Sequence, residues 1–355
     1  MNPAKNWPAR QQAIENLSNT RWIPPWWLRL GRKVGISSDR WITLPPGVYI
    51  LIYHSVVDPD NRQEWERHYQ KGETSCAVFA RQLEILLEWM TPLPLSAVPK
   101  LWKQGDVHRP YLVVTFDDGY ANNRSVADPV VQSLGIRPTV FVNGAFATHE
   151  IFFRVLAAWL IKCNRSRPLA TALQAAIPEV TWSPDPETLF YQTKWHYHAE
   201  RLEQTIQQVF MREIGPLSGR GVHLSVEEVR ELQNRGWEIG NHTWGHRILS
   251  GLNGAQIEAS IQENATFWEQ AGVGLIPFLA YPLGRACDVS PAVEECLQNR
   301  PDLHGIFGNG GVNLQPNRME WLRFSLGSLC ERTPIREALS REVLRTRQAF
   351  SQIKN

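Results

Sequence analysis

The chain of 355 residues is predicted to fold as an α/β protein with about seven parallel strands that alternate with helices. Short apolar runs, rich in β-branched residues, recur from about residue 48 onwards, and segments of helical period separate them. Hydrophobic residues make up 43% of the chain, which is enough to bury a large core. Such strands pair in parallel, so the fold is a barrel or a doubly wound sheet, with chemistry expected at the carboxyl ends of the strands.

Each strand follows from its local pattern. Seven short apolar runs are predicted as strands: 48–54, 111–118, 138–144, 237–242, 277–282, 304–308 and 321–326. The helix after the first strand is indicated by apolar residues at helical spacing: Phe79, Leu83, Leu86, Leu87 and Met90. The helix after the second strand covers roughly 122–134 and is expected to end at Gly135, in the C′ position.

Capping residues mark the later helices. Ser225 and Glu228 have capping-box spacing, which predicts a helix that begins at Ser225 and ends at Gly236. Three more helices are predicted: one over about 254–271, a short one with Ser290 as N-cap and Pro291 at N1, and a last one beginning at Thr333.

An insertion separates the third and fourth strands. Residues 145–222 contain the apolar run IFFRVLAAWLI and the amphipathic run HAERLEQTIQQVFMREIG, so the insertion is predicted to be mainly helical. It leaves the sheet at the carboxyl end of a strand and is expected to influence substrate choice. The predicted organisation is therefore an N-terminal Trp- and Pro-rich extension (1–47), a main domain (48–330) and a C-terminal helix (331–355).

Charge and cysteine content exclude several classes of protein. Lys and Arg number 37 and Asp and Glu number 35, and a net charge of +2 does not suggest nucleic-acid binding or disorder. Five scattered cysteines without a CxxC pair indicate neither a disulfide framework nor a thiolate zinc site, and their odd number fits a reducing compartment. Neither a signal-type apolar region nor a membrane span is evident, so a cytoplasmic location is expected.

Two polar clusters follow predicted strands. Asp117 and Asp118 lie in TFDDGY after the second strand, and His242 and His246 lie in NHTWGH after the fourth. Two imidazoles four residues apart can bind one metal ion if the backbone turns helically between them, and one carboxylate would complete an open, catalytic set of three ligands. The other carboxylate could then accept a proton from water whose pKa the metal lowers to about 7. Taken separately, the acidic pair fits a turn and a helix cap, and the histidine pair fits a loop.

These motifs resemble the first and second motifs of the polysaccharide deacetylases, which have the NodB homology fold of carbohydrate esterase family 4. Three flanking segments resemble the branch of that family with a Phe-Ala-Tyr-Pro-x-Gly third motif: YHSV (53–56), WEIGNH (237–242) and AYPLG (280–284). The resemblance covers roughly 48–330 apart from the insertion. It implies a distorted (β/α) barrel of about seven parallel strands.

The resemblance also implies roles for individual residues. Asp118, His242 and His246 would bind a divalent metal ion, with zinc the first expectation, and Asp117 would be the general base acting on the metal-bound water. A backbone N–H of the third motif, here that of Leu283, would help to hold the developing oxyanion.

The chain departs from the family pattern at two places. Ala280 stands where the commoner third motif has an arginine that orients the base, and Arg323 is the candidate replacement, unless it pairs with another acid. The last motif lacks the histidine that protonates the leaving amine, and His54 is the candidate acid, with a structural role as its alternative. Three residues are candidate sugar contacts, with simple packing as the alternative for each: Tyr120, Asn143 and Trp244.

The expected function is that of a metal-dependent hydrolase that removes an acetyl group from an N-acetylated sugar, as a glycan or as a lipid-linked or nucleotide-linked precursor. One alternative is a carbohydrate-binding homologue with weak catalysis, and another is the same metal chemistry on an O-acetyl ester or a cyclic amide. The basic, Trp-rich segment 21–34 either covers the bottom of the barrel or makes peripheral contact with a membrane where lipid-linked sugars reside.

Overall fold

The computed structural model describes most of the chain from residue 44 onwards: 44–70, 72–148, 150–196, 201–217, 219–308, 310–315 and 320–351. The segment 21–34, on which the membrane expectation rests, lies outside the described residues, as does nearly all of the N-terminal extension. Within these ranges, no helix has the length and apolarity needed to cross a membrane.

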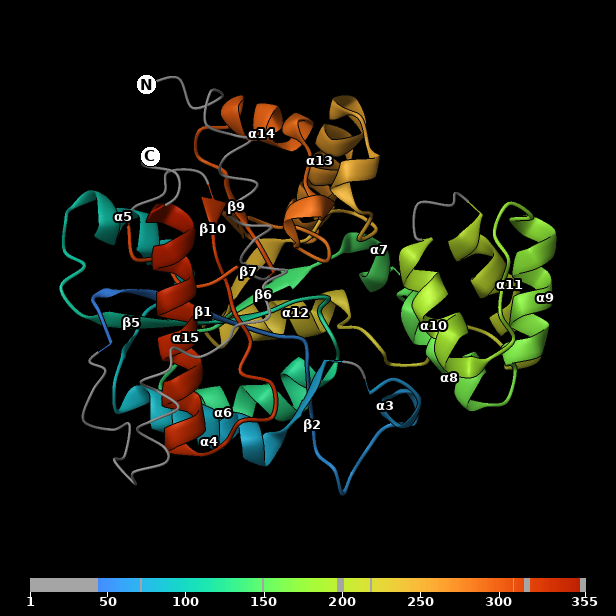
Figure 1. Cartoon of the computed structure of the whole chain (residues 1–355), viewed down its shortest axis with the longest axis horizontal. Coiled ribbons are helices and arrows are strands. Elements are labelled where there is room, and N and C mark those ends of the chain that lie inside the picture. Colours follow the sequence, from blue (N-terminus) through green and yellow to red (C-terminus); the bar gives the residue numbers. More distant parts are fainter. Residues whose placement is uncertain are drawn as a thin grey trace.

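Most strands of the described residues belong to one parallel sheet, in which the strands of the main path follow chain order. Its path is β1 (Gly47–Tyr53), β5 (Pro110–Phe116), β6 (Thr139–Val142), β7 (Glu238–Asn241), β8 (Leu275–Ala280), β9 (His304–Ile306) and β10 (Glu320–Trp321). A doubly wound sheet reverses its strand order at a switch point, and this sheet does not. Beyond β10, Phe324 pairs in parallel with Leu51 of β1, so the sheet curls back towards its first strand as a distorted barrel (Figure 1).

The last strand is shorter than predicted. Regular pairing covers Glu320–Trp321, so only Trp321 of the expected 321–326 belongs to the strand. The side chain of Asn313 explains the interruption, because it donates to the Leu322 carbonyl (2.9 Å) and accepts from the Leu322 N–H (2.9 Å). These bonds occupy the backbone groups that a neighbouring strand would otherwise satisfy.

Several short elements lack a sequence signature of their own. They are α3 (Glu64–His68), the parallel pair β2 (Ser55–Val57) and β3 (Glu73–Ser75), and β4 (Thr91–Pro92), which pairs with the start of β5. Each has five residues or fewer, which is too short for a hydrophobic period to be visible.

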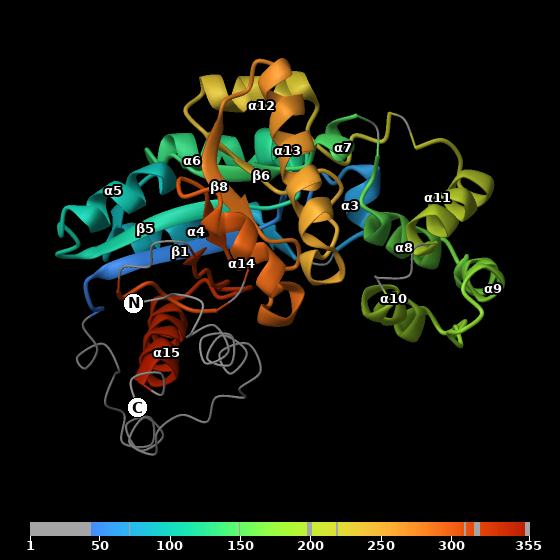
Figure 2. The ribbon, with the colours of Figure 1, turned by 90° about the horizontal axis from the view of Figure 1, so that it is seen from above.

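Helices cover the outer face of the sheet (Figures 1 and 2). They are α4 (Cys76–Leu87), α5 (Val98–Lys103), α6 (Asp128–Ser133), α12 (Val226–Asn234), α13 (Gly254–Gln270), α14 (Pro291–Gln298) and α15 (Arg332–Ser351), with 3₁₀ turns at 95–97, 249–251 and 286–288. The capping box at Ser225 and Glu228 is confirmed by its two hydrogen bonds. Ser290 does precede α14, but its side chain makes no capping bond.

The helix predicted over 122–134 begins with a wider turn. Residues Asn123–Ala127 form a π-helical turn before α6, and Gly135 follows with a positive φ of 65°. The side chains of Asn122 and Asn123 reach across to Ser55 and to the carbonyl of His54. These contacts tie the start of the helix to the chain just after β1, near the expected chemistry.

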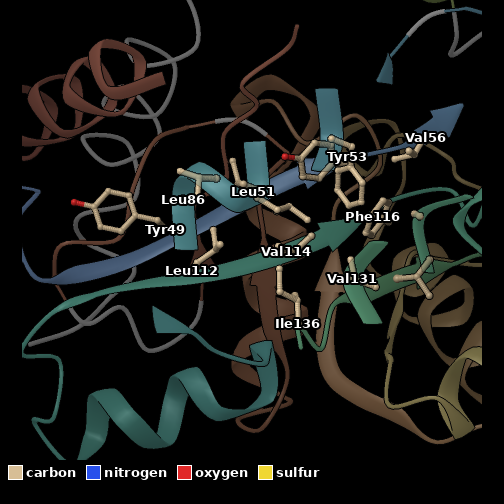
Figure 3. Close-up of a cluster of buried hydrophobic side chains, with 14 of the residues drawn as sticks. Tyr49, Leu51, Tyr53, Val56, Leu86, Leu112, Val114, Phe116, Val131 and Ile136 are labelled. Carbon is tan, nitrogen blue, oxygen red and sulfur yellow. The ribbon is translucent and has the colours of Figure 1, made fainter. Parts of the chain in front are cut away.

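The core has two layers because side chains alternate along each strand. Val48 and Ile50 of β1 point into the barrel, where they meet Phe278, Ile306 and other buried side chains. The intervening side chains point outward to the helices. Figure 3 shows this outer layer, in which β1 and β5 residues meet α4 and α6: Tyr49, Leu51, Tyr53, Leu112, Val114, Phe116, Leu86 and Val131. Each fully buried side chain of this size contributes about 1.5–3 kcal/mol.

The insertion is helical within its described residues, as predicted. It contains α7 (Gly144–Ala147), α8 (Phe153–Lys162), α9 (Ser166–Ala176), α10 (Pro186–Trp195) and α11 (Leu202–Glu213). Helices α8–α11 lie together at one side of the barrel (Figures 1 and 2). Their apolar core includes Trp159 and Phe210 and extends to Trp65 of α3 and to Tyr120, which follows β5. The insertion therefore packs against the barrel end where the acidic motif lies.

Candidate active site

The two aspartates lie at the carboxyl end of β5 and are both buried. The N–H of Asp117 donates to the carbonyl of Tyr53 (3.0 Å), which continues the pairing of β5 with β1. Asp118 then adopts a left-handed backbone with a φ of 68°. The chain turns sharply here, and both carboxylates come within 4 Å of His242 Nε2.

The two histidines follow β7. His242 Nδ1 lies 2.8 Å from the carbonyl of Ala280, and because a carbonyl only accepts, Nδ1 carries a proton. In the neutral ring, Nε2 then has the lone pair that a metal ion would bind. His242 Nε2 and His246 Nε2 lie 3.3 and 3.2 Å from Asp118 Oδ1. A helical turn between the histidines was predicted, but the structure shows a non-helical one. Positive φ values of 65° at Thr243 and 57° at His246 bring the two rings together instead.

Buried amides hold this loop in place. The side chain of Asn143 donates to the carbonyls of His242 (2.5 Å) and Thr243 (2.9 Å). Asn241 Oδ1 accepts from the N–H of Thr243 (2.8 Å) and from the amide of Asn264 (2.9 Å). Such bonds are needed because a non-glycine residue in the left-handed region is strained.

Backbone strain is concentrated at this site. Five non-glycine residues of the described ranges have a positive φ, and four of them belong to it: Asp118, Thr243, His246 and Leu283. Strain of this kind, on the order of 1–3 kcal/mol for each residue, persists only where surrounding contacts fix the conformation. The fold therefore maintains this arrangement at a cost in stability, which is typical of functional sites.

Asp118, His242 and His246 fit a divalent metal ion. Their ligand atoms all lie within 4.8 Å of one another. With metal–ligand bonds of about 2.0–2.1 Å, neighbouring ligands of a tetrahedral site lie about 3.3 Å apart, close to the 3.2 and 3.3 Å seen here. Asp118 Oδ1 and His242 Nε2 are buried, and among the described residues neither has a hydrogen-bond partner. Lone pairs that face one another in this way repel unless a cation lies between them.

Arg323 holds the other carboxylate. It is fully buried, and its two terminal nitrogens donate to Asp117 Oδ1 (2.6 Å) and Oδ2 (2.7 Å), while its Nε donates to the carbonyl of Phe307 (2.8 Å). Burial alone would raise the pKa of Asp117, but the Arg323 guanidinium and His242 outweigh burial and lower it. Asp117 is therefore ionised at neutral pH and fixed in orientation. The structure thus brings Arg323 to the residue that the missing third-motif arginine would have oriented.

The electrostatics of Asp118 follow the same pattern. Burial raises its pKa, but His246 and His242 outweigh burial and hold the pKa of this carboxyl well below its usual range. Asp118 is therefore an anion, as a metal ligand must be.

The third motif forms a rigid turn after β8. Leu283 and Gly284 both have left-handed backbones, with φ values of 60° and 63°. A Cβ at Gly284 would lie only 2.1 Å from the backbone nitrogen of Gly308, so only glycine fits. In the described chain, no group accepts a hydrogen bond from the N–H of Leu283. This donor is therefore available to a ligand.

His54 lies at the carboxyl end of β1, as its position in the sequence implied. It is half-buried, its carbonyl accepts from the side chain of Asn123 (2.8 Å), and its ring is within electrostatic range of both Asp117 and Asp118. The structure therefore brings His54 to the edge of the same site.

The three candidate sugar contacts lie in packing positions. Tyr120 is buried and stacks on Trp65, with ring centres 5.3 Å apart. Asn143 is buried and uses its amide to hold the histidine loop. Trp244 is half-buried between Gly144 and Phe267, where a Cβ on Gly144 would collide with its ring. All three side chains therefore make contacts within the fold, and their roles as sugar contacts stay predictions.

His223 is a residue of the site that the sequence analysis missed. Its Nδ1 donates to the carbonyl of Asp118 (3.0 Å) and its Nε2 accepts from the N–H of Phe152 (3.3 Å). The ring is stacked between Tyr120 and Phe146, and burial lowers its pKa to about 4, so it is neutral. His223 therefore links the strained backbone of Asp118 to the insertion. It belongs to no motif, so only the folded chain reveals this role.

Replacing His223 by Leu is expected to destabilise the protein by about 1–3 kcal/mol for each of the two backbone groups left buried and unpaired, and to weaken metal binding. Urea denaturation and metal titration measure the two effects. His223→Asn keeps a donor near the position of Nδ1 and should recover part of both. Unchanged stability and metal affinity in the Leu variant would refute the assigned role.

Fold and site together define the class of this protein. Parallel strands in a distorted barrel carry a carboxylate pair and two imidazoles at their carboxyl ends, which is the arrangement of a barrel hydrolase. Residues 104–298 match the family described as "Polysaccharide deacetylase". The chain belongs to this family, and it is a hydrolase acting on carbon–nitrogen bonds of acetylated polysaccharide.

Solved structures of similar fold include IcaB from Ammonifex degensii, with 16% identity over 83% of this chain and 97% of that one and a TM-score of 0.50. The Streptococcus pyogenes deacetylase PplD in complex with acetate has 15% identity over 78% of this chain and 93% of that one, with a TM-score of 0.48. At these identities the likeness to IcaB supports the fold alone. No curated protein matches the chain.

Proposed function

We propose that the protein removes the acetyl group of an N-acetylated saccharide by metal-assisted hydrolysis, with Asp117 as the general base. The observation that carries the proposal is the convergence of three lone-pair donors beside a second, ionised carboxylate that a buried arginine holds. A module that only binds sugars needs neither the open donor set nor the adjacent base.

Asp118, His242 and His246 are the residues that would hold the metal. Two imidazoles and one carboxylate are the donor set of catalytic zinc sites, and we propose zinc as the resident ion. Bound there, a divalent metal ion supplies Lewis acidity towards the acetyl carbonyl and lowers the pKa of water.

The remaining steps belong to side chains and one backbone group. Asp117 accepts the proton of the attacking water. Arg323 fixes the orientation of the Asp117 carboxylate by donating a hydrogen bond to each of its oxygens. The N–H of Leu283 donates to the oxyanion as negative charge develops. His54 delivers a proton to the leaving amine from the edge of the site.

Removal of the metal is expected to abolish acetate release, and reloading with zinc to restore it, because both the water and the acetyl oxygen lose their cation. The measurement is acetate released from N-acetylglucosamine oligomers by chelated and reloaded protein. Asp118→Ala should neither hold the metal after desalting nor regain activity on reloading. Asp185→Asn, which alters an exposed helix cap outside the site, is the matched control.

An enzyme with full activity after exhaustive chelation, or an Asp118→Ala variant with wild-type metal content, would overturn the proposal. The same assay on O-acetyl esters and on lipid-linked or nucleotide-linked N-acetyl sugars defines the substrate. An enzyme that cleaves only the esters would contradict the amide specificity proposed here.

A further inference from the structure

Three cationic side chains from two separate parts of the fold lie near one another. Arg154 comes from α8 and Lys194 from α10, both in the insertion, and Arg285 directly follows the Leu283–Gly284 turn. Arg154 is buried, with only 8% of its surface exposed, and the other two are half-buried. A cation is seldom buried to this degree without a partner, and the partners of Arg154 are neutral: the ring of Phe190 and the hydroxyl of Tyr69.

Contacts and charge place these three groups together. The Arg154 guanidinium lies over the ring of Phe190, 4.6 Å from its centre. Phe190 is one helical turn before Lys194, so both occupy the same side of α10. Lys194 is within electrostatic range of both Arg285 and Arg154, and burial together with these two cations lowers the pKa of Lys194.

Acidic groups do not balance this cluster. Among the described residues, Asp288 is the carboxylate that acts on Lys194, and it already accepts two hydrogen bonds from the Arg285 side chain, at 2.8 and 2.6 Å. Neither Arg154 nor Lys194 forms an ion pair with a carboxylate of the described residues. Within the described ranges, Asp288 thus compensates Arg285 first and Lys194 only in part, and Arg154 has no carboxylate in an ion pair.

The cluster lies next to the candidate active site. Arg285 is two residues beyond Leu283, whose N–H is the proposed oxyanion donor. On the insertion side, Tyr69 is within electrostatic range of both Arg154 and Asp118, and its ring lies 6.3 Å from that of Tyr120. Helix α8 packs against α3, as Figure 2 shows, at the barrel end that carries the site.

We propose that Arg154, Lys194 and Arg285 form a subsite for an anionic group of the saccharide, a phosphate or a carboxylate, next to the acetylated sugar. This inference rests on the proposed deacetylase function and narrows its substrate class to anionic glycans. Like charges held together at partly buried positions raise the free energy of the unliganded protein, and an oxyanion relieves that repulsion. Guanidinium groups also match phosphate and carboxylate oxygens in geometry.

The test compares three acetylated oligosaccharides of equal length: a neutral N-acetylglucosamine oligomer, one carrying a phosphate and one carrying a uronate carboxylate. The wild-type enzyme should have a lower KM for one or both anionic oligosaccharides than for the neutral one. The oligosaccharide with the lower KM identifies the anionic group that the subsite binds. In Lys194→Gln this KM advantage should shrink on the order of tenfold, because a charge-assisted hydrogen bond is lost. Lys194→Arg should restore most of it. Lys103→Gln, on α5 far from the insertion, is the charge-matched control and should change nothing.

Equal KM values for the three substrates in the wild-type enzyme would overturn the subsite, as would an unchanged preference in Lys194→Gln. A binding measurement separates this failure from failure of the deacetylase function. Calorimetric titration with inorganic pyrophosphate should give weaker binding to Lys194→Gln than to the wild type, even if no oligomer releases acetate. Pyrophosphate affinity that is equal in the two proteins counts against the subsite.

Discussion

Asp117→Asn is expected to lower kcat by roughly 10²–10⁴-fold while the protein keeps its metal. The amide occupies the same volume and keeps one oxygen for Arg323, so the site should retain its shape. It cannot accept a proton at neutral pH, however, so the attacking water loses its base. The effect should appear in kcat more than in KM, because proton transfer belongs to the transition state.

The measurement pairs kcat for acetate release with metal content in the same preparation. Asp118→Asn is the matched comparison, because it alters the neighbouring carboxylate and should lose both metal and activity. The two variants therefore separate the base from the ligand. Wild-type kcat in Asp117→Asn would remove this residue from the mechanism, and loss of its metal would show that the two aspartates share the ligand role.

The strand positions could be predicted because each strand is a short, locally apolar segment. Strand patterns alone did not decide between a barrel and a doubly wound sheet, because that choice depends on which strands become neighbours. The family resemblance predicted the barrel, and the structure confirms it. Pairing of Phe324 with Leu51 joins residues far apart in the chain, and no local period encodes it. The shortening of the last strand also depends on a contact outside that strand. The Asn313 side chain bonds to the Leu322 backbone in place of a neighbouring strand.

The candidate site was predictable where its residues are neighbours in sequence. The Asp-Asp and His-x-x-x-His pairs each lie in one motif, and the structure brings the two motifs together. His223 and Arg154 belong to no motif and meet the site only through packing of the insertion. The sugar contacts were inferred from residue type alone, and residue type does not show that Tyr120 is covered by Trp65.

Arg323 is an intermediate case. An arginine in an apolar strand is a visible anomaly, and Ala280, which stands in place of the third-motif arginine, indicated that Arg323 orients Asp117. The structure gives the physical reason why the substitution is tolerated. The carboxyl ends of the strands lie at the same end of the barrel, so a guanidinium from the chain after β10 can reach Asp117 in place of one at position 280, the last residue of β8.

Arg323→Met is expected to lower the free energy of unfolding by about 3–5 kcal/mol near neutral pH, because it leaves the Asp117 carboxylate buried without its counter-ion. The sign of the pH dependence follows from the pKa of Asp117, which Arg323 and His242 lower in the folded protein. A lowered pKa stabilises the fold above the unfolded-state pKa, and this contribution is lost as pH falls through the folded-state value. The stability gap between wild type and variant should therefore narrow in acid.

The same substitution should move the acid limb of the pH–rate profile to higher pH, since burial then raises the pKa of Asp117 with less opposition. Arg323→Lys keeps the charge but loses the bidentate hydrogen bonds to Asp117. Its stability and its acid-limb pKa should therefore lie between those of the wild type and Arg323→Met. A double-mutant cycle with Asp117→Asn measures the coupling directly. If the two residues act as one pair, Arg323→Met should destabilise Asp117→Asn much less than it destabilises the wild type. Strictly additive losses in the free energy of unfolding would instead mean that the two residues are not coupled.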